Sequence, residues 1–174
     1  MSGRLPPRLE TPRLTLRGLR DDDIDAYAAM LADPEVTRFF DGPVERSEAW
    51  RQMAVHAGHW VLRGYGQWAL VEQASDKLVG RAGLWQPEGW PGLEVGWVLA
   101  RAHWGKGLAT EAAWAGLHHA FEALGAEHVI SLIRPDNHRS IRVAERLGEH
   151  YERKVELAGM AHHVYGIDRA DWSG

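Results

Sequence analysis

The 174-residue sequence contains no cysteine, which excludes disulfide bonds, thiolate zinc sites and a cysteine nucleophile. It also lacks any apolar run approaching the roughly 20 residues that span a bilayer, and residues 1–10 do not resemble a signal peptide. Charges of both signs are scattered, and a net charge of −4 offers no field that would attract nucleic acid or an anionic membrane. These absences predict a soluble, cytoplasmic protein with no nucleic-acid partner and no membrane partner.

The chain also shows no internal repeat, no low-complexity tract and no linker between domains. Its length is ordinary for one domain, and a hydrophobic content of 45% suffices for a core without disulfides or a structural metal. We therefore expect a single domain over residues 1–174, with its core at about residues 9–170.

Hydrophobic periodicity and turn residues predict the order strand, two helices, three strands, helix, strand, helix and two strands. The predicted strands cover residues 14–17, 67–72, 78–85, 93–99, 128–133, 151–157 and 160–167. The predicted helices cover residues 21–31, 47–62 and 107–124, and a last helix runs from the turn at residues 135–137 to residue 147. This order predicts an α+β fold, an α/β sandwich with a mixed sheet and helices on its faces. The unit from residue 93 to residue 133 should form a right-handed parallel crossover.

A glycine-rich turn carries the strongest functional signal in the sequence. Gly105 and Gly107 lie between the strand predicted over residues 93–99 and the helix predicted to begin at residue 107. Glycines allow a tight bend there, and free N–H groups at a helix start, with Lys106 beside them, suit a pyrophosphate. The segment is neither a Walker loop nor a dinucleotide fingerprint. Taken alone, the two glycines also fit an ordinary strand-to-helix turn.

Three segments together resemble the GNAT acetyltransferase superfamily. Residues 94–112 (EVGWVLARAHWGKGLATEA) resemble its acyl-CoA motif, and residues 135–148 (PDNHRSIRVAERLG) resemble its second signature. Residues 9–17 (LETPRLTLR) are similar to the first strand of the ribosomal-protein-alanine acetyltransferase branch, which includes enzymes that act on small amines. The segments occur in the family's order and cover nearly the whole chain, so the resemblance implies an acetyltransferase.

The resemblance implies a mostly antiparallel sheet whose central parallel strands, residues 93–99 and 128–133, splay apart into a V. Acetyl-CoA would lie in this V as the cosubstrate, with an amine as the acceptor. The residues that the resemblance assigns to the cofactor are Trp97, Val98 and Leu99 for the pantetheine arm, Gly105, Lys106, Gly107, Leu108, Ala109 and Thr110 for the pyrophosphate, and Asn137 beside the arm. It also implies that the N–H near Val98 polarises the thioester carbonyl, and it leaves a homodimer open.

Three positions depart from the family's pattern. Ala102 stands where many members carry Gln or Arg, three residues before the first glycine. Ala144 stands where many members carry a tyrosine that protonates the leaving thiolate, and Glu149 replaces the usual aromatic residue. The first two departures keep open a rival hypothesis from another class, an acyl-CoA-binding module without turnover.

Acetylation of an amine requires a base for the amine proton and a proton or hydrogen bond for the leaving thiolate. Glu94 is the candidate base, because it begins the strand that lines the cofactor and is followed by apolar residues that favour a raised pKa. The alternative is a surface glutamate at a strand start. Ser140 is the candidate donor to the thiolate, and the alternative is a first-turn serine that bonds to the helix backbone.

The sequence leaves the acceptor open between a protein N-terminus and a small amine such as a polyamine, amino acid or aminoglycoside. Trp85 and Trp90 bracket a loop where the family places its acceptor, and exposed rings there would form a binding wall. Ten histidines include His56 and His59, but no spacing is typical of a metal site. We expect these histidines to be solvated and expect no metal.

Overall fold

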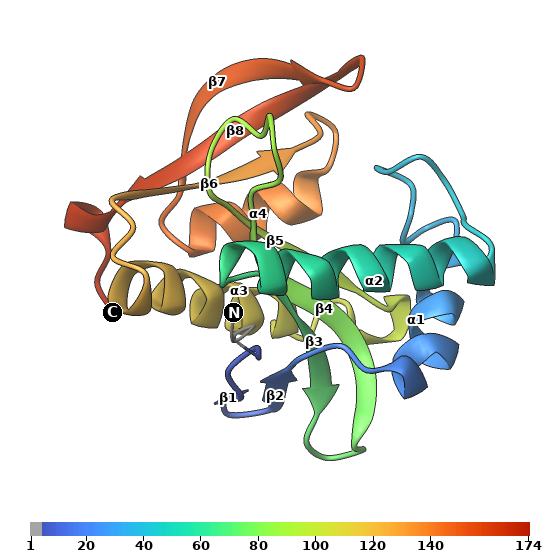
Figure 1. Ribbon diagram of the computed structural model, residues 1–174. Coiled ribbons are helices and arrows are strands. Elements are labelled where there is room, and N and C mark those ends of the chain that lie inside the picture. Colours follow the sequence, from blue (N-terminus) through green and yellow to red (C-terminus); the bar gives the residue numbers. More distant parts are fainter. Residues whose placement is uncertain (1–4) are drawn as a thin grey trace.

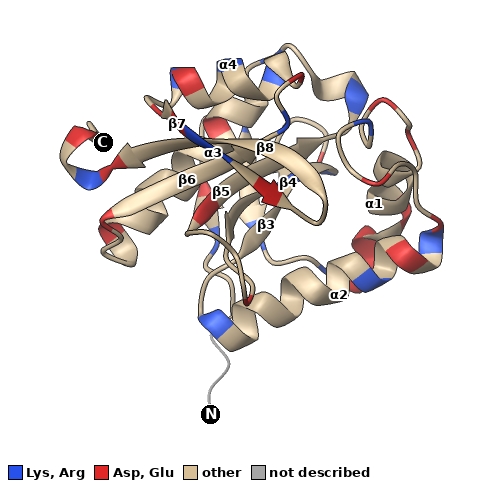
Figure 2. Cartoon of the chain, turned by 90° about the horizontal axis from the view of Figure 1, so that it is seen from above, with Lys and Arg blue, Asp and Glu red and all other residues tan. Residues whose placement is uncertain are grey.

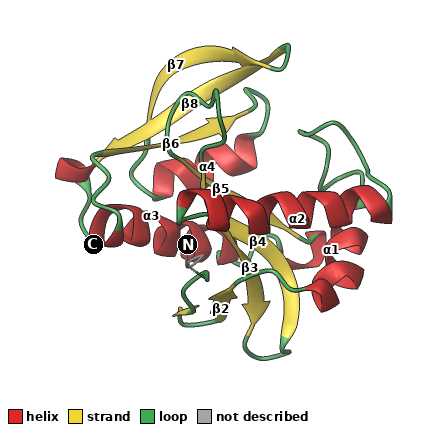
Figure 3. Cartoon of the chain, viewed as in Figure 1, coloured by secondary structure: helices red, strands yellow, loops and turns green. Residues whose placement is uncertain are grey.

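The computed structural model describes residues 5–174, which form one eight-stranded sheet in the order β1-β2-β3-β4-β5-β6-β8-β7. The strands are β1 (Leu9–Glu10), β2 (Leu14–Arg17), β3 (Gln67–Glu72), β4 (Lys77–Trp85), β5 (Glu94–Leu99), β6 (His128–Ile133), β7 (His150–Leu157) and β8 (Met160–Asp168). The helices are α1 (Ile24–Leu31), α2 (Arg46–Arg63), α3 (Leu108–His118) and α4 (His138–Arg146). The predicted element order is confirmed, with the short edge strand β1 as an addition (Figure 3).

Local sequence explains where the helices begin and end. Gly64 ends α2 in a left-handed conformation with a φ of +77°, which a residue with a side chain rarely adopts. Asn137 caps α4 through its side chain, as expected for an asparagine in a turn before a helix. The helix predicted over residues 107–124 is divided, because α3 is followed by a single π-type turn over His119–Ala123.

Helices cover both faces of the sheet. α3 and α4 pack on one face, where Val95 and Leu117 belong to the same buried cluster. α1 and α2 pack on the other face, where Tyr27 shares a cluster with Val98. Val95 and Val98 lie an odd number of residues apart on β5, so their side chains point to opposite faces. Seen from above in Figure 2, α2 and α4 lie on opposite sides of the sheet.

The sheet opens in its middle. Every neighbouring pair of strands is antiparallel except β5 and β6, which are parallel and pair at one position only, Glu94 with Ile130. The ladder ends there, and the two halves of the sheet separate beyond it: β6, β7 and β8 occupy the upper part of Figure 1, and β2, β3 and β4 the lower part. The mixed, mostly antiparallel sheet with splayed parallel strands is therefore confirmed.

Lys and Arg residues are interspersed with Asp and Glu over the helices and loops (Figure 2). Within residues 5–174, no helix combines the length and the apolar character that a membrane crossing requires.

Candidate active site

The point where β5 and β6 separate brings Glu94 into the middle of the molecule. The Ile130 N–H donates to the Leu93 carbonyl at 2.8 Å, beside the one position where the two strands pair. Beyond it the ladder does not continue, and the Leu132 backbone acts on the Glu94 carboxyl group and helps to lower its pKa. Glu94 therefore lies at the apex of the splay, at the junction of both strands, with its side chain partly buried.

The surroundings of Glu94 hold its pKa near neutrality. Burial raises the pKa of this carboxyl from 4.5 to about 7, although a hydrogen bond from Trp90 Nε1 at 2.6 Å, the Leu132 backbone and the charge of Arg81 oppose the rise. A base is most effective when its pKa lies near the working pH, because it is then ionised and still takes up a proton readily. A carboxyl group with this pKa is partly ionised at neutral pH and can take up a proton.

Arg81 supplies a positive charge beside this carboxyl without an ion-pair partner of its own. Its Nε donates to the Tyr27 hydroxyl at 3.0 Å, and a second N–H donates to the side-chain carbonyl of Gln67. Among residues 5–174, no carboxylate lies within ion-pair distance of Arg81. Its charge therefore acts on Glu94 and helps to keep the pKa of that group from rising further.

The histidines of α2 are buried, so the expectation that they would be solvated is wrong. His56 and His59 are only 7% and 6% exposed. The Gln86 N–H donates to His59 Nε2 at 3.1 Å, so the proton lies on Nδ1, which donates to the Tyr65 carbonyl at 2.7 Å. Burial, followed by the charge of Arg81, lowers the pKa of His56 well below 6.5. The side chains that the structure describes include no group of three or more potential metal ligands.

The two tryptophans that bracket the loop after β4 have different roles. Trp85 stacks on His59 with ring centroids 4.5 Å apart, so it packs the loop against α2 and does not form an open wall. Trp90 turns toward Glu94 and donates to its carboxyl group. Glu88, at the tip of the loop, is almost fully exposed and lies 3.3 Å from Arg63. Only Trp90 thus contacts the candidate base.

The glycine turn has the geometry of an anion site. Gly105 and Gly107 adopt φ values of +72° and +79°, the left-handed region that glycine tolerates best. No side chain caps the start of α3. The N–H groups of its first turn therefore remain available to a phosphate, and the helix dipole favours negative charge there. The residues predicted for the pyrophosphate, 105–110, lie together in this turn.

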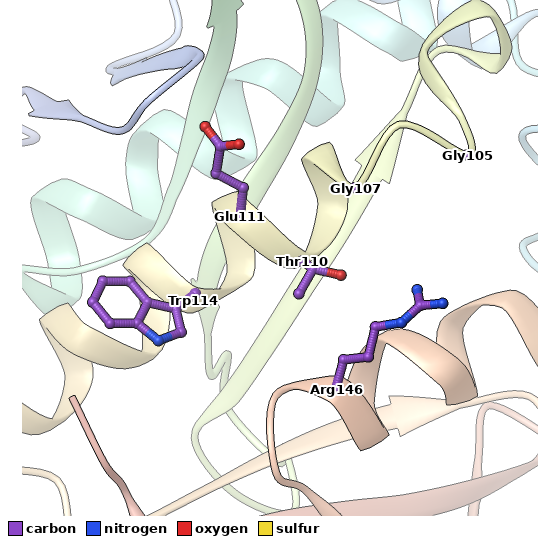
Figure 4. A pocket seen from close by; sticks show the side chains of 6 residues that line it. All are labelled: Gly105, Gly107, Thr110, Glu111, Trp114 and Arg146. Atoms are coloured by element: carbon purple, nitrogen blue, oxygen red, sulfur yellow. The ribbon is translucent and has the colours of Figure 1, made fainter.

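An open hollow of about 560 Å³ adjoins this turn, and its lining residues are Gly105, Gly107, Thr110, Glu111, Trp114 and Arg146 (Figure 4). In Figure 4, the side chains of Thr110 on α3 and Arg146 on α4 extend toward each other across the hollow. A cation and free N–H groups facing one space suit a phosphate-bearing ligand.

A clamp that the sequence did not reveal anchors the turn to the N-terminal segment. Arg13 Nε contacts Glu111 Oε2 at 2.7 Å, and Arg13 Nη1 donates to the Lys106 carbonyl at 2.7 Å. Thr11 Oγ1 donates to Glu111 Oε1 at 2.6 Å. Burial raises the pKa of Glu111, but these hydrogen bonds and the Arg13 charge outweigh it and hold the pKa below the usual value. The clamp therefore neutralises the only acid in the hollow's lining.

The predicted residues of β5 and α4 meet across the splay. Trp97 Nε1 donates to Ser140 Oγ at 3.3 Å. The Asn137 side-chain oxygen accepts the Ser140 N–H at 3.3 Å, so the amide group of Asn137 keeps its own N–H donors. Val98 and Leu99 are buried on β5. The structure thus brings Trp97, Ser140 and Asn137 together.

The side chains of two other positions considered in the sequence are buried in the core. Leu108 is 2% exposed and packs in the core with Ala112, so its side chain faces away from solvent. Ala144, where the family's tyrosine would stand, is fully buried beside Ile133 and Tyr165.

The chain matches the family model described as Acetyltransferase (GNAT) domain over residues 13–150. It is 31% identical over 153 residues to the Bacillus subtilis (strain 168) protein YkkB, covering 85% of this chain and 88% of the relative. It is 30% identical over 142 residues to the uncharacterized N-acetyltransferase p20 of Bacillus licheniformis, covering 80% of each. The solved acetyltransferase from Agrobacterium tumefaciens str. C58 superposes with a TM-score of 0.83 at 31% identity, covering 92% of this chain and 94% of that one.

The splayed sheet, the glycine turn before α3 and these similarities lead to one conclusion. The chain belongs to the GNAT acetyltransferase family and has its fold.

Proposed function

We propose that this chain is an N-acetyltransferase that moves an acetyl group from acetyl-CoA to a primary amine. The observation that carries the proposal is Glu94, a carboxyl with a pKa of about 7 at the apex of the splay. An alkylamine is mostly protonated at neutral pH, so the reaction requires such a base.

The residues around the splay fit acetyl-CoA. The N–H groups at the start of α3 would hold the pyrophosphate, and Gly105 and Gly107 would let it approach the backbone. Asn137, with free amide donors, would bind the pantetheine arm that β5 lines. Acetyl-CoA supplies the activated acetyl group as a thioester.

Side chains of this chain then handle the protons. Glu94 takes a proton from the amine, directly or through water, while Trp90 orients its carboxyl group. The N–H near Val98 donates to the carbonyl oxygen. Ser140, held by Trp97, donates a hydrogen bond to the departing sulfur. A serine in this role compensates in part for the missing tyrosine at Ala144.

The family supports a transferase, whereas the acceptor class is part of the proposal: a protein N-terminus or a small-molecule amine. The rival function, an acyl-CoA-binding module without turnover, rests on Ala144 and Ala102. A binding module without turnover would give no reason for the near-neutral pKa of Glu94 at the apex of the splay, so we favour the enzyme. The composition without cysteine supports a cytoplasmic location.

An acceptor screen tests the proposal. The protein is incubated with acetyl-CoA and peptides with free N-termini, polyamines, amino acids or aminoglycosides, and the released CoA thiol is measured with a thiol reagent. We expect release that depends on one acceptor class and falls in Glu94→Gln. Tight binding of acetyl-CoA without thiol release for any class would favour the binding module.

A further inference from the structure

Side chains replace the backbone ladder at the apex of the splay. In the register set by Glu94 and Ile130, the next bond of a parallel ladder would join the Leu132 N–H to the Val95 carbonyl. That pairing is absent, and the Val95 carbonyl accepts a hydrogen bond from Ser131 Oγ at 2.8 Å. The Leu132 backbone lies close enough to the Glu94 carboxyl group to lower its pKa. The Ser131 side chain therefore satisfies a backbone carbonyl that the opening would leave unpaired.

The buried carboxyl group of Glu149, which lies between α4 and β7 in the chain, adjoins Ser131. Glu149 is 1% exposed, and its Oε1 lies 3.0 Å from Ser131 Oγ. Its second oxygen, Oε2, is buried without a hydrogen-bond partner. Buried glutamates are rare unless they are paired or functional. The proposed reaction uses Glu94 and Ser140 and gives Glu149 no part.

The two contacts of the Ser131 hydroxyl group indicate that Glu149 is protonated. The Ser131 hydroxyl has one hydrogen, but two oxygen atoms lie within hydrogen-bond distance, on Val95 and on Glu149. A carbonyl has no hydrogen to offer, so the Ser131 hydrogen belongs to the 2.8 Å contact with Val95. A neutral Glu149 carboxyl group supplies a hydrogen for the 3.0 Å contact between Ser131 and Glu149, so that Ser131 does not divide one hydrogen between two acceptors. The result is a directed chain, from Glu149 to Ser131 to the Val95 carbonyl.

The electrostatics agree with a neutral acid. Burial is the largest cause that raises the pKa of Glu149 well above 4.5, and the charges of Glu94 on β5 and Glu152 on β7 raise it further. Within the described chain, no basic side chain forms an ion pair with Glu149. An ionised carboxylate in such a place would be strongly unfavourable.

We propose that Glu149 is a positioning residue that, as a neutral acid, fixes Ser131 and the Val95 carbonyl and thereby holds Glu94 at the apex of the splay. Val95 follows Glu94 directly, so a displaced Val95 carbonyl moves the base relative to the acceptor. The catalytic effect of Glu149 rests on the proposed acetyl transfer. The hydrogen bonds from Glu149 to Ser131 and from Ser131 to the Val95 carbonyl can be measured without any acceptor.

The first test compares three variants in steady-state kinetics. Glu149→Gln keeps a donor for Ser131 at every pH, whereas Glu149→Leu has similar volume and no donor, and Ser131→Ala breaks the chain at its middle. We expect Glu149→Gln to keep kcat within about twofold, and the other two to lower kcat on the order of tenfold, because small displacements of a base cost much of its effect. The KM for acetyl-CoA should change less, since the glycine turn lies elsewhere. Equal kcat in folded Glu149→Leu and wild type would overturn the positioning role.

The second test detects the proton on Glu149 by infrared spectroscopy. The infrared difference spectrum between wild type and Glu149→Gln at neutral pH should contain the band of a protonated carboxylic acid. Glu156→Gln, an exposed change on β7, is the matched control and should remove a carboxylate band. A carboxylate band for Glu149 would mean that this group is ionised and cannot donate to Ser131. This result would overturn the chain of donors from Glu149 to Ser131 to the Val95 carbonyl, whether or not the protein acetylates any amine. A protein that shows the acid band but transfers no acetyl group would keep the chain of donors and lose only the catalytic consequence.

Discussion

At the scale of single residues, Glu94 decides whether the splay is a catalytic centre. We expect Glu94→Gln to lower turnover by about 10²–10⁴-fold, because the amide keeps the volume and loses the base. Affinity for acetyl-CoA should stay nearly constant, since Glu94 is remote from the turn at residues 105–110. Turnover with saturating acceptor and calorimetric titration with CoA measure the two quantities. An unchanged kcat would leave bulk water or another group as the base.

The same residue predicts a pH dependence. Only the ionised carboxylate accepts a proton, so wild-type turnover should fall as the pH drops through about 7, the pKa of Glu94, and Glu94→Gln should lack this limb. The free energy of unfolding changes with pH in the opposite direction. The pKa of Glu94 in the folded protein lies above its unfolded value, so the stability that this group contributes is complete below pH 4.5 and is lost as the pH rises through about 7. A wild-type rate profile without a limb near neutrality would contradict the assignment.

Ser140 tests how the thiolate leaves. We expect Ser140→Ala to slow acetyl transfer less than Glu94→Gln does, because one lost hydrogen bond costs roughly 1–3 kcal/mol in a partly buried site. Ser140→Thr keeps a hydroxyl and should recover most of the rate. Since Trp97 also loses its acceptor in the alanine variant, CoA affinity must be measured alongside. Turnover of Ser140→Ala equal to wild type would mean that solvent protonates the thiolate.

Individual contacts were predictable only where sequence neighbours make them. Asn137 and Ser140 are three residues apart, and an asparagine before a helix predicts their cap. Arg13 and Glu111 are far apart in sequence, and nothing local to either residue indicates that they meet. The replacement of an aromatic residue by Glu149 was visible in the sequence, but its partner Ser131 depends on how two strands diverge.

At the scale of elements, periodicity predicted nearly every helix and strand, because each buries one face against the sheet. The exceptions have physical causes. β1 has only two residues, too few for any alternation to appear. The π-type turn at His119–Ala123 retains helical spacing, so the sequence does not distinguish it from a continuous helix.

The turn before α3 yields a prediction for an element. Gly107→Val should weaken acetyl-CoA binding at least tenfold, because a branched side chain would enter the space beside the N–H groups and restrict a left-handed backbone. Gly159→Val is the matched control, since Gly159 has a similar φ of +73° in the distant β7–β8 hairpin, with open space around it. Both variants should lose similar stability in thermal melts, and only Gly107→Val should lose affinity. Equal CoA affinity in both would make the turn merely structural.

At the scale of the whole molecule, the sheet order joins elements that the sequence keeps apart. The strand order, with β6 beside β5 on one side and β8 on the other, brings Glu94, Ser131 and Glu149 to one point. Composition and periodicity specified the layers but not the splay, since a parallel pair that opens after one residue has no hydrophobic signature. The resemblance to the GNAT family supplied that feature, and the structure confirmed it.

Ligand binding should stabilise the whole fold, because the splay joins both halves of the sheet. Acetyl-CoA at about 100 times its dissociation constant should add roughly 2.7 kcal/mol to the free energy of unfolding. For a chain of this size, that corresponds to a rise in Tm of about 5–10 °C. Differential scanning calorimetry measures the shift, and an acetyl thioester of N-acetylcysteamine, which lacks the pyrophosphate, should produce a much smaller one. The Gly107→Val variant should show little shift at the same acetyl-CoA concentration, because its anion site is disrupted. A wild-type Tm that stays constant at millimolar acetyl-CoA would remove the basis for placing the cofactor in the splay.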